Sequence, residues 1–201
     1  MSAFTWPPES STPASSDDAG PAEQVPAAVL VALFLAARVP AGAQEPYVVL
    51  TKRRSDLRRH AGEISFPGGR KDAEDADLLA TALRETEEEI GLARSRVQLL
   101  GELPPTSTFV TNYVIQPFVA TISAGTDWKV SASEVEAVLE LPLSALRAGR
   151  TRTRLQRRGI SFETDAYVVD EHLIWGATAR ILENLLERLR ERGPAGQLSL
   201  A

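Results

Sequence analysis

Apolar and polar positions alternate along the chain in patterns that predict both strands and helices. Residues 27–37 read AAVLVALFLAA, a continuous run of apolar side chains that predicts a buried strand. Pro117 indicates an edge position or a bulge in the strand that contains it. The arginine-rich segment 147–158 ends at Gly159, where we expect a hairpin. The remaining strands are expected at 46–52, 97–103, 109–122, 134–142 and 160–169.

Helical periodicity is clearest in two segments. One helix is predicted to end at Gly91, a plausible C-terminal stop, and a second covers 176–192 with leucines and isoleucines on one side. A short helix is expected at 143–148. Strands before and after one strongly patterned helix, with another helix at the end, predict a compact α/β sandwich in which helices flank a mixed sheet.

Three glutamates are predicted to lie on one side of the helix that precedes Gly91. Glu85, Glu88 and Glu89 follow the i, i+3, i+4 spacing. Like charges at that spacing destabilise a helix unless a cation compensates them, and carboxylate oxygens suit Mg²⁺ or Mn²⁺. Arg84 lies one turn from Glu88 and is expected to orient the carboxylates. We therefore expect a divalent metal site, an interpretation that we favour over a solvated acidic face.

The segment before this helix combines a glycine turn with a cationic loop. Residues 66–69 read FPGG, and glycine permits a close approach of carbonyls or phosphates, so Gly68 and Gly69 are candidates for contact with metal and substrate. The alternative is a simple strand-to-helix turn. Guanidinium groups bind phosphate oxygens through charge-assisted hydrogen bonds, so a phosphate-rich substrate is favoured over a solvated loop. The candidate contacts are Arg53 and Arg58, with His60 as a weaker one.

Composition and charge narrow the class of protein. The 201 residues are enough for one domain with a core, and a net charge of −5 argues against a stable nucleic-acid partner. The absence of cysteine excludes disulfides and fits the cytoplasm, where we expect the protein. Residues 27–37 are about half the ~20 needed to cross a bilayer, so no membrane association is expected. The composition predicts a flexible tail at 1–24, a domain at 25–192 and a second tail at 193–201.

Two sequence signatures resemble those of a known family. Residues 84–92, RETEEEIGL, resemble the second half of the Nudix hydrolase box, GX5EX7REUXEEXGU, where U is aliphatic. Thr86 departs at an aliphatic position, and Asp75 replaces the expected early glutamate with eight residues before Arg84. Upstream, VLTKR at 49–53, Arg58, Gly62 and FPGG have the spacing of a signature similar to that of coenzyme A diphosphatases, with Arg54 in place of a small residue.

The resemblance implies a Nudix fold, an α/β/α sandwich, and a metal-dependent hydrolase of nucleotide diphosphate conjugates. It favours coenzyme A or acyl-coenzyme A as the substrate, with 3′,5′-ADP and (acyl) 4′-phosphopantetheine as products. The implied metal ligands for Mg²⁺ or Mn²⁺ are Glu85, Glu88, Glu89 and the carbonyl of Gly68. The implied substrate contacts are Arg53, Arg58, His60, Gly69 and Tyr113.

Several alternatives stay open from the sequence. Glu85, Glu88 and Glu134 are all candidates for the general base, and Glu134 is as well explained by solubility alone. The substrate could be another conjugate, such as NADH, ADP-ribose or a dinucleoside polyphosphate, or the domain could be a non-catalytic nucleotide sensor. The arginine run at 147–158 fits a solvated hairpin better than contact with substrate phosphate or with a neighbouring subunit in a homodimer.

Overall fold

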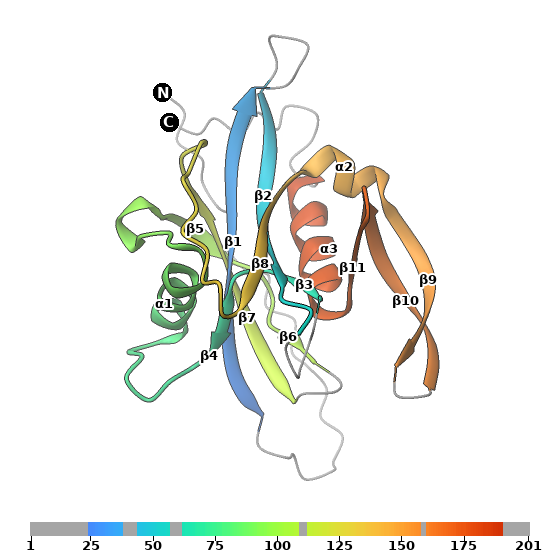
Figure 1. The fold of residues 1–201 in the computed structure, drawn as a ribbon, viewed down its shortest axis with the longest axis horizontal. Coiled ribbons are helices and arrows are strands. Elements are labelled where there is room, and N and C mark those ends of the chain that lie inside the picture. Colours follow the sequence, from blue (N-terminus) through green and yellow to red (C-terminus); the bar gives the residue numbers. More distant parts are fainter. Residues whose placement is uncertain (1–23, 38–43, 57–61, 109–111, 158–159, 191–201) are drawn as a thin grey trace.

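The structure of the protein is a computed structural model that describes residues 24–37, 44–56, 62–108, 112–157 and 160–190 (Figure 1). The tails predicted at 1–24 and 193–201 fall almost entirely outside these residues. The predicted domain boundaries therefore stay predictions.

An eight-stranded mixed sheet forms the centre of the molecule (Figure 1). The long strand β1 (Val25–Ala37) pairs antiparallel with β2 (Gln44–Arg53) and parallel with β7 (Tyr113–Thr121), in the order β3-β2-β1-β7-β5. In addition, β4 pairs with β1, β6 with β7 and β8 with β2. The shorter strands are β3 (Ile64–Ser65), β4 (Gly68–Arg70), β5 (Gln98–Glu102), β6 (Thr106–Ser107) and β8 (Val135–Pro142).

The position of Pro117 excludes an edge, which was one of the two alternatives expected from the sequence. Pro117 lies inside β7, which has β1 on one side and both β5 and β6 on the other, so it is not at an edge. Its carbonyl accepts a hydrogen bond from the backbone N–H of Leu103, in the gap between β5 and β6. The ring nitrogen points to the same side, so the missing donor falls where the ladder is already interrupted.

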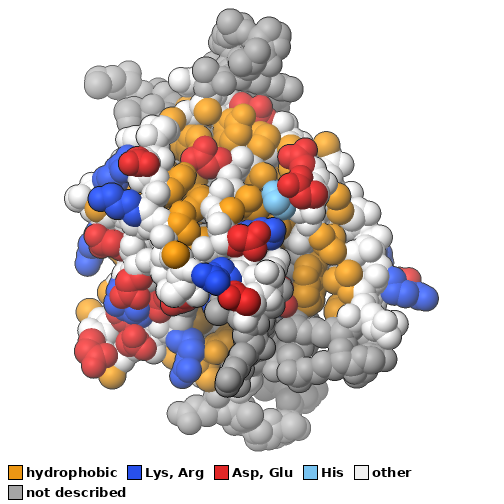
Figure 2. Space-filling view, viewed as in Figure 1, with side chains coloured by type: hydrophobic (Ala, Val, Ile, Leu, Met, Phe, Trp, Pro, Cys, Tyr) orange, Lys and Arg blue, Asp and Glu red, His pale blue; other side chains and the backbone are white. Residues whose placement is uncertain are grey.

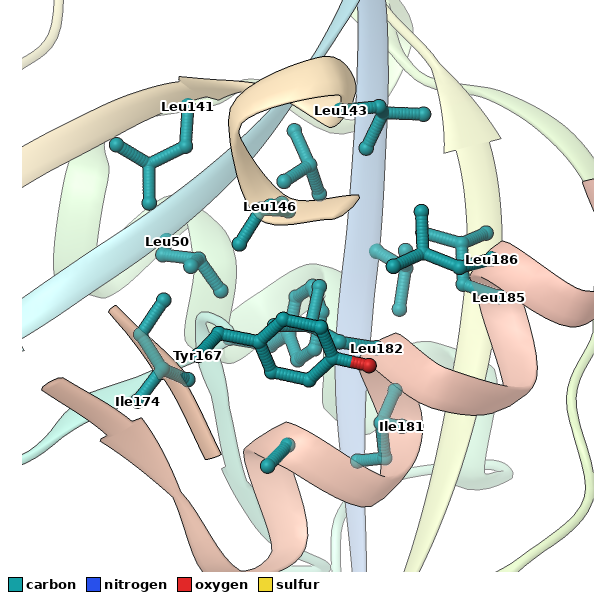
Figure 3. Close-up of a cluster of buried hydrophobic side chains, with 14 of the residues drawn as sticks. Leu50, Leu141, Leu143, Leu146, Tyr167, Ile174, Ile181, Leu182, Leu185 and Leu186 are labelled. Carbon is teal, nitrogen blue, oxygen red and sulfur yellow. The ribbon is translucent and has the colours of Figure 1, made fainter. Parts of the chain in front are cut away.

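Helices cover both faces of the sheet, as predicted. Figure 1 shows α1 (Leu78–Ile90) on one side and α2 (Leu143–Ala148) with α3 (Gly176–Arg190) on the other. Successive residues of β1 divide between the two cores: Leu30 packs on the α1 side, whereas Val31 packs on the α3 side. Figure 3 shows the second core, where leucines of α3 meet Tyr167. The predicted α/β/α sandwich is confirmed.

A separate three-stranded antiparallel sheet lies beside α3. It consists of β9 (Arg150–Arg157), β10 (Ile160–Val169) and β11 (His172–Trp175). The predicted hairpin is thus confirmed, but its third strand and its separation from the main sheet were not predicted. Within the described part of the chain, no helix is long and apolar enough to cross a membrane.

Candidate active site

A capping residue defines each end of α1, Asp77 at the N-terminus and Gly91 at the C-terminus. The carboxylate of Asp77 accepts a hydrogen bond of 2.7 Å from the backbone N–H of Ala80, and Gly91 adopts the left-handed conformation at φ 70°. Thr86, which replaces an aliphatic residue of the Nudix box, is buried. Its hydroxyl donates a hydrogen bond of 2.6 Å to the carbonyl of Ala82, so the buried polar group is satisfied. The helix therefore keeps its register and holds its acids in place.

The loop between β7 and β8 is attached to the C-terminal end of α1. The backbone N–H of Lys129 donates to the carbonyl of Ile90 at 3.0 Å, and that of Ser131 donates to Glu89 at 2.8 Å. These bonds satisfy helix carbonyls that have no partner within the helix. Glu134 follows in the same loop, and its N–H donates to Ser131 at 3.1 Å. The loop thereby ties the backbone around Glu134 to that of Glu89.

Glu89 belongs to a group of acids that Arg53 and Arg84 contact and that we call the acid cluster: Asp72, Asp75, Glu85, Glu88, Glu89 and Glu134. Its side chain is nearly buried and accepts a hydrogen bond of 3.2 Å from the backbone N–H of Gly68. The guanidinium of Arg53 lies 3.6 Å from Glu89 and 3.8 Å from Glu134. Burial raises the pKa of Glu89 to about 7; Gly68 and Arg53 oppose that rise, whereas the charges of Glu85 and Glu134 add to it.

Glu85 lies directly against the glycine turn. A Cβ atom at Gly69 would lie 2.4 Å from the carboxylate carbon of Glu85, so the carboxylate occupies the space that only glycine leaves open. Gly68 has a φ of 148°, and a Cβ there would lie 2.2 Å from the carbonyl oxygen of Ala28. Burial raises the pKa of Glu85, although Arg84 opposes the shift.

Arg84 is held by a carboxylate that the sequence analysis did not include in the site. Asp75 is buried and accepts two hydrogen bonds of 2.9 Å from the guanidinium of Arg84, and one of 2.9 Å from the hydroxyl of Thr81. These bonds to Arg84 hold the pKa of Asp75 well below its usual range. Arg84 also lies 3.0 Å from Glu85 and 3.2 Å from Glu88, so it positions both carboxylates.

The three glutamates of α1 do not occupy equivalent positions. Glu85 and Glu89 lie against the glycine turn, whereas the side chain of Glu88 is 60% exposed and is held by Arg84. Figure 2 shows acidic and basic side chains mixed on the surface over α1. Among the described residues, no three His, Cys, Asp or Glu side chains are grouped closely enough to hold a metal ion as they stand.

The donor set nevertheless fits a hard divalent cation. Glu85 and Glu89 offer carboxylate oxygens beside the backbone of Gly68, and oxygen is the ligand atom that Mg²⁺ and Mn²⁺ prefer. The raised pKa values of both acids reflect a cost of burying negative charge, which a cation would offset. Glu88 would join them only by turning away from Arg84, and Glu134 is close enough to repel the charge on Glu89.

The other predicted substrate contacts are less closely tied to this cluster. Arg58 and His60 lie outside the described residues. Tyr113 is the first residue of β7, and its backbone exchanges hydrogen bonds with Thr108, including one from Tyr113 N–H to the threonine hydroxyl at 2.9 Å. Within the described part of the chain, neither an ion pair nor a hydrogen bond joins Tyr113 to the acids.

The arginines of β9 contact acids of the same chain. Arg150 forms an ion pair with Glu183 of α3, while Arg152 and Arg154 lie 3.8 and 3.4 Å from Glu163 of the adjacent strand. These contacts agree with a hairpin whose charges are partly compensated within the domain.

The helix-flanked mixed sheet holds the buried Glu89 and the partly buried Glu85 beside a glycine turn, and comparison with known proteins identifies the family in which this arrangement occurs. The family model described as NUDIX domain matches residues 28–157, and the chain belongs to the Nudix family. It is 41% identical over 143 residues to the Nudix hydrolase NudL of Salmonella paratyphi B, which is itself described as uncharacterized; the match covers 70% of this chain and 74% of that protein.

Solved structures show the same fold at low sequence identity. A Nudix hydrolase from M. smegmatis gives a TM-score of 0.54 at 12% identity, with 89% of each chain covered. A mutT/nudix family protein from Listeria innocua gives 0.52 at 16% identity, with 84% of this chain and 95% of that chain covered. The family model and the 41% identical relative, rather than these structures, make the protein a Nudix hydrolase, a pyrophosphohydrolase of nucleoside diphosphate conjugates, and enzymes of this family generally use divalent metal ions.

Proposed function

We propose that the protein hydrolyses the diphosphate bond of coenzyme A or acyl-coenzyme A to 3′,5′-ADP and (acyl) 4′-phosphopantetheine. The observation that carries this proposal is the position of Arg53, which ends the VLTKR segment and lies beside both Glu89 and Glu134. That segment resembles the signature of coenzyme A diphosphatases, so the residue of the signature and the acids of the Nudix box meet at one place.

Arg53 is suited to hold a diphosphate at the acids. Its distances of 3.6 and 3.8 Å from the two carboxylates are longer than hydrogen bonds, so its N–H groups can turn to phosphate oxygens without breaking a short contact. The guanidinium also offsets part of the negative charge that would repel the substrate. Arg53 therefore binds and orients the diphosphate in our proposal.

The acids have separate roles in the proposal. Glu85 and Glu89 hold the divalent cation, with the Gly68 backbone beside them, and Glu88 completes the set. When bound, Mg²⁺ or Mn²⁺ neutralises phosphate oxygens and makes water a stronger acid. We assign proton acceptance to Glu134 because its side chain is 53% exposed and so reaches water, while the ties of its loop to α1 keep it beside Glu89.

The buried Glu89 and the partly buried Glu85 argue against a non-catalytic nucleotide sensor. Burial keeps Glu85 and Glu89 in an environment that disfavours their charged forms, which costs the fold stability without improving nucleotide binding. In a metal-dependent hydrolase, both carboxylates would bind the cation, and the cation would offset the cost of burying their charge.

The test is mass-resolved product analysis with Mg²⁺ or Mn²⁺ and a panel of coenzyme A, acetyl-coenzyme A, NADH, ADP-ribose and a dinucleoside polyphosphate. We expect 3′,5′-ADP from the coenzyme A compounds, and loss of turnover in Glu89→Gln. Glu134→Gln should lower kcat with little change in KM, and more than Glu88→Gln does. Turnover of another panel member alone would refute the substrate, and metal-independent nucleotide binding without turnover would favour the sensor.

A further inference from the structure

A cavity of about 460 Å³ lies between the β2–β3 pair and the separate β9–β11 sheet. Phe162 and Trp175 form one wall, with ring centroids 6.2 Å apart and planes inclined by 49°. Leu155 and Leu173 extend this wall, and Ile64 of β3 faces it. Figure 2 shows hydrophobic side chains gathered at the surface over the β9–β11 sheet. The volume is in the range of small-molecule sites.

The cavity and the acid cluster flank the same end of the β2–β3 pair. Neighbouring residues of a strand point to opposite faces, and Arg53 points to Glu89 whereas Lys52 lines the cavity. The backbone N–H of Arg53 donates to the carbonyl of Glu63 at 3.0 Å, and Glu63 also lines the cavity. One layer of backbone therefore separates the two places.

The chemistry of the cavity favours a neutral chain over a phosphate or a nucleotide. Its positive group, Lys52, is already paired with Glu136 at 2.7 Å, and Glu63 and Glu171 add negative charge at the lining. Gln156 and His172 supply polar groups that can bond to amides. The remaining lining is aliphatic and aromatic, which suits an apolar chain that carries few polar atoms.

We infer that the cavity binds the uncharged half of the substrate, an amide-bearing chain with an apolar acyl end, while the diphosphate lies at the acid cluster. The inference rests on the proposed function, because it needs a substrate with such an arm. The arm must extend past one sheet layer, about 10 Å in thickness, so pantetheine with an acyl chain is long enough whereas a second nucleoside has the wrong chemistry.

Octanoyl-pantetheine, the arm without the nucleotide, tests the cavity by calorimetry on the metal-free protein. We expect binding to the wild-type chain and a Kd about tenfold higher in Phe162→Ala, because the chain loses aromatic contact area. Leu155→Ser is a second variant at a half-buried position, in case the first unfolds. Val168→Ala is the matched control: Val168 is 45% exposed on β10 and does not line the cavity, so its Kd should not change.

Parallel kinetics with Mg²⁺ separate this inference from the proposed function. We expect KM for octanoyl-coenzyme A to rise in Phe162→Ala and Leu155→Ser and to stay constant in Val168→Ala. Failure of octanoyl-pantetheine to bind, or equal weakening by all three substitutions, would overturn the inference even if coenzyme A is hydrolysed. Binding of the arm without hydrolysis of coenzyme A would refute the proposed function and keep the cavity as a site for neutral chains.

Discussion

The substitution Glu89→Gln should stabilise the metal-free protein while it removes activity. Glu89 is only 4% exposed, and the pKa of its carboxylate rises from an ordinary 4.5 to about 7 in the fold. Such a rise corresponds to up to about 3 kcal/mol of stability lost when the group is charged in the native state. Glutamine has the shape of the neutral acid, and its amide oxygen can still accept the N–H of Gly68.

The sign of this effect depends on pH. Because the folded-state pKa lies above the unfolded one, the native state binds more protons between pH 4.5 and 7, and stability falls as the pH rises through that window. Above pH 7 the variant should gain up to about 3 kcal/mol, or about 6–12 °C in unfolding temperature for a chain of this size. Near pH 4 the two proteins should unfold at similar temperatures.

Thermal unfolding in a metal chelator, at pH 4 and at pH 8, measures the difference, and added Mg²⁺ or Mn²⁺ should stabilise the wild type more than the variant. Glu87→Gln is the matched control, since Glu87 is an exposed residue of the same helix, and it should not show the pH-dependent gain. A variant less stable than the wild type at pH 8, or a difference independent of pH, would refute the assignment of Glu89 as a buried, charge-strained metal ligand.

Three further substitutions test the supporting contacts. Asp75→Asn should lower the free energy of unfolding by about 2–4 kcal/mol at pH 7, because Arg84 loses its buried partner. That loss should shrink in urea unfolding as the pH falls below the ordinary carboxyl value of 3.8, since the pKa of Asp75 is lowered in the fold; a constant difference would contradict this. Gly91→Ala should cost about 1–2 kcal/mol in thermal unfolding, because φ is 70° and a Cβ would lie 2.6 Å from a side-chain carbon, and an unchanged unfolding temperature would argue otherwise. Gly69→Ala should keep the fold but lower kcat roughly tenfold to a hundredfold by displacing the carboxylate of Glu85, whereas full activity would separate Glu85 from the reaction.

The sequence predicted most of the fold because its elements carry strong local signals. The apolar run of β1, the periodic helix α1 with its stop at Gly91, and the amphipathic α3 are all present. These signals are local: the periodicity of apolar residues and the left-handed conformation of one glycine are both determined by residues close in the sequence. The partners of each strand depend on distant residues, which explains why the three-stranded sheet and the central place of Pro117 were missed.

The candidate site was predicted in part for the same reason. The spacing of Glu85, Glu88 and Glu89 located the acids on α1, but it could not rank them by burial, since burial depends on where the glycine turn packs. The sequence does not assign Asp75 to the site, because the Nudix box has a glutamate at that place and separates it from the arginine by one residue fewer than this chain does. The signal that could have identified Asp75 was its chemistry: an acid that precedes a helix carrying an arginine. Aspartate has a shorter side chain than glutamate, but one extra residue before Arg84 still lets Asp75 reach its guanidinium.

The distribution of charge explains where a cation and a diphosphate would meet. Among the described residues, six carboxylates form the acid cluster, and two guanidinium groups, Arg84 and Arg53, contact them. Arg84 lies within 3.4 Å of four of these acids, at Asp72, Asp75, Glu85 and Glu88. Glu89 and Glu134 lie 3.6 and 3.8 Å from Arg53, so these two acids lack a short ion pair. We therefore propose that a divalent cation binds beside Glu89, because buried charge attracts a counterion most strongly where no short ion pair offsets it. A diphosphate would then meet positive charge from the cation and from Arg53 together, which is why the arginine of β2 and the acids of α1 have to meet at the same end of the sheet.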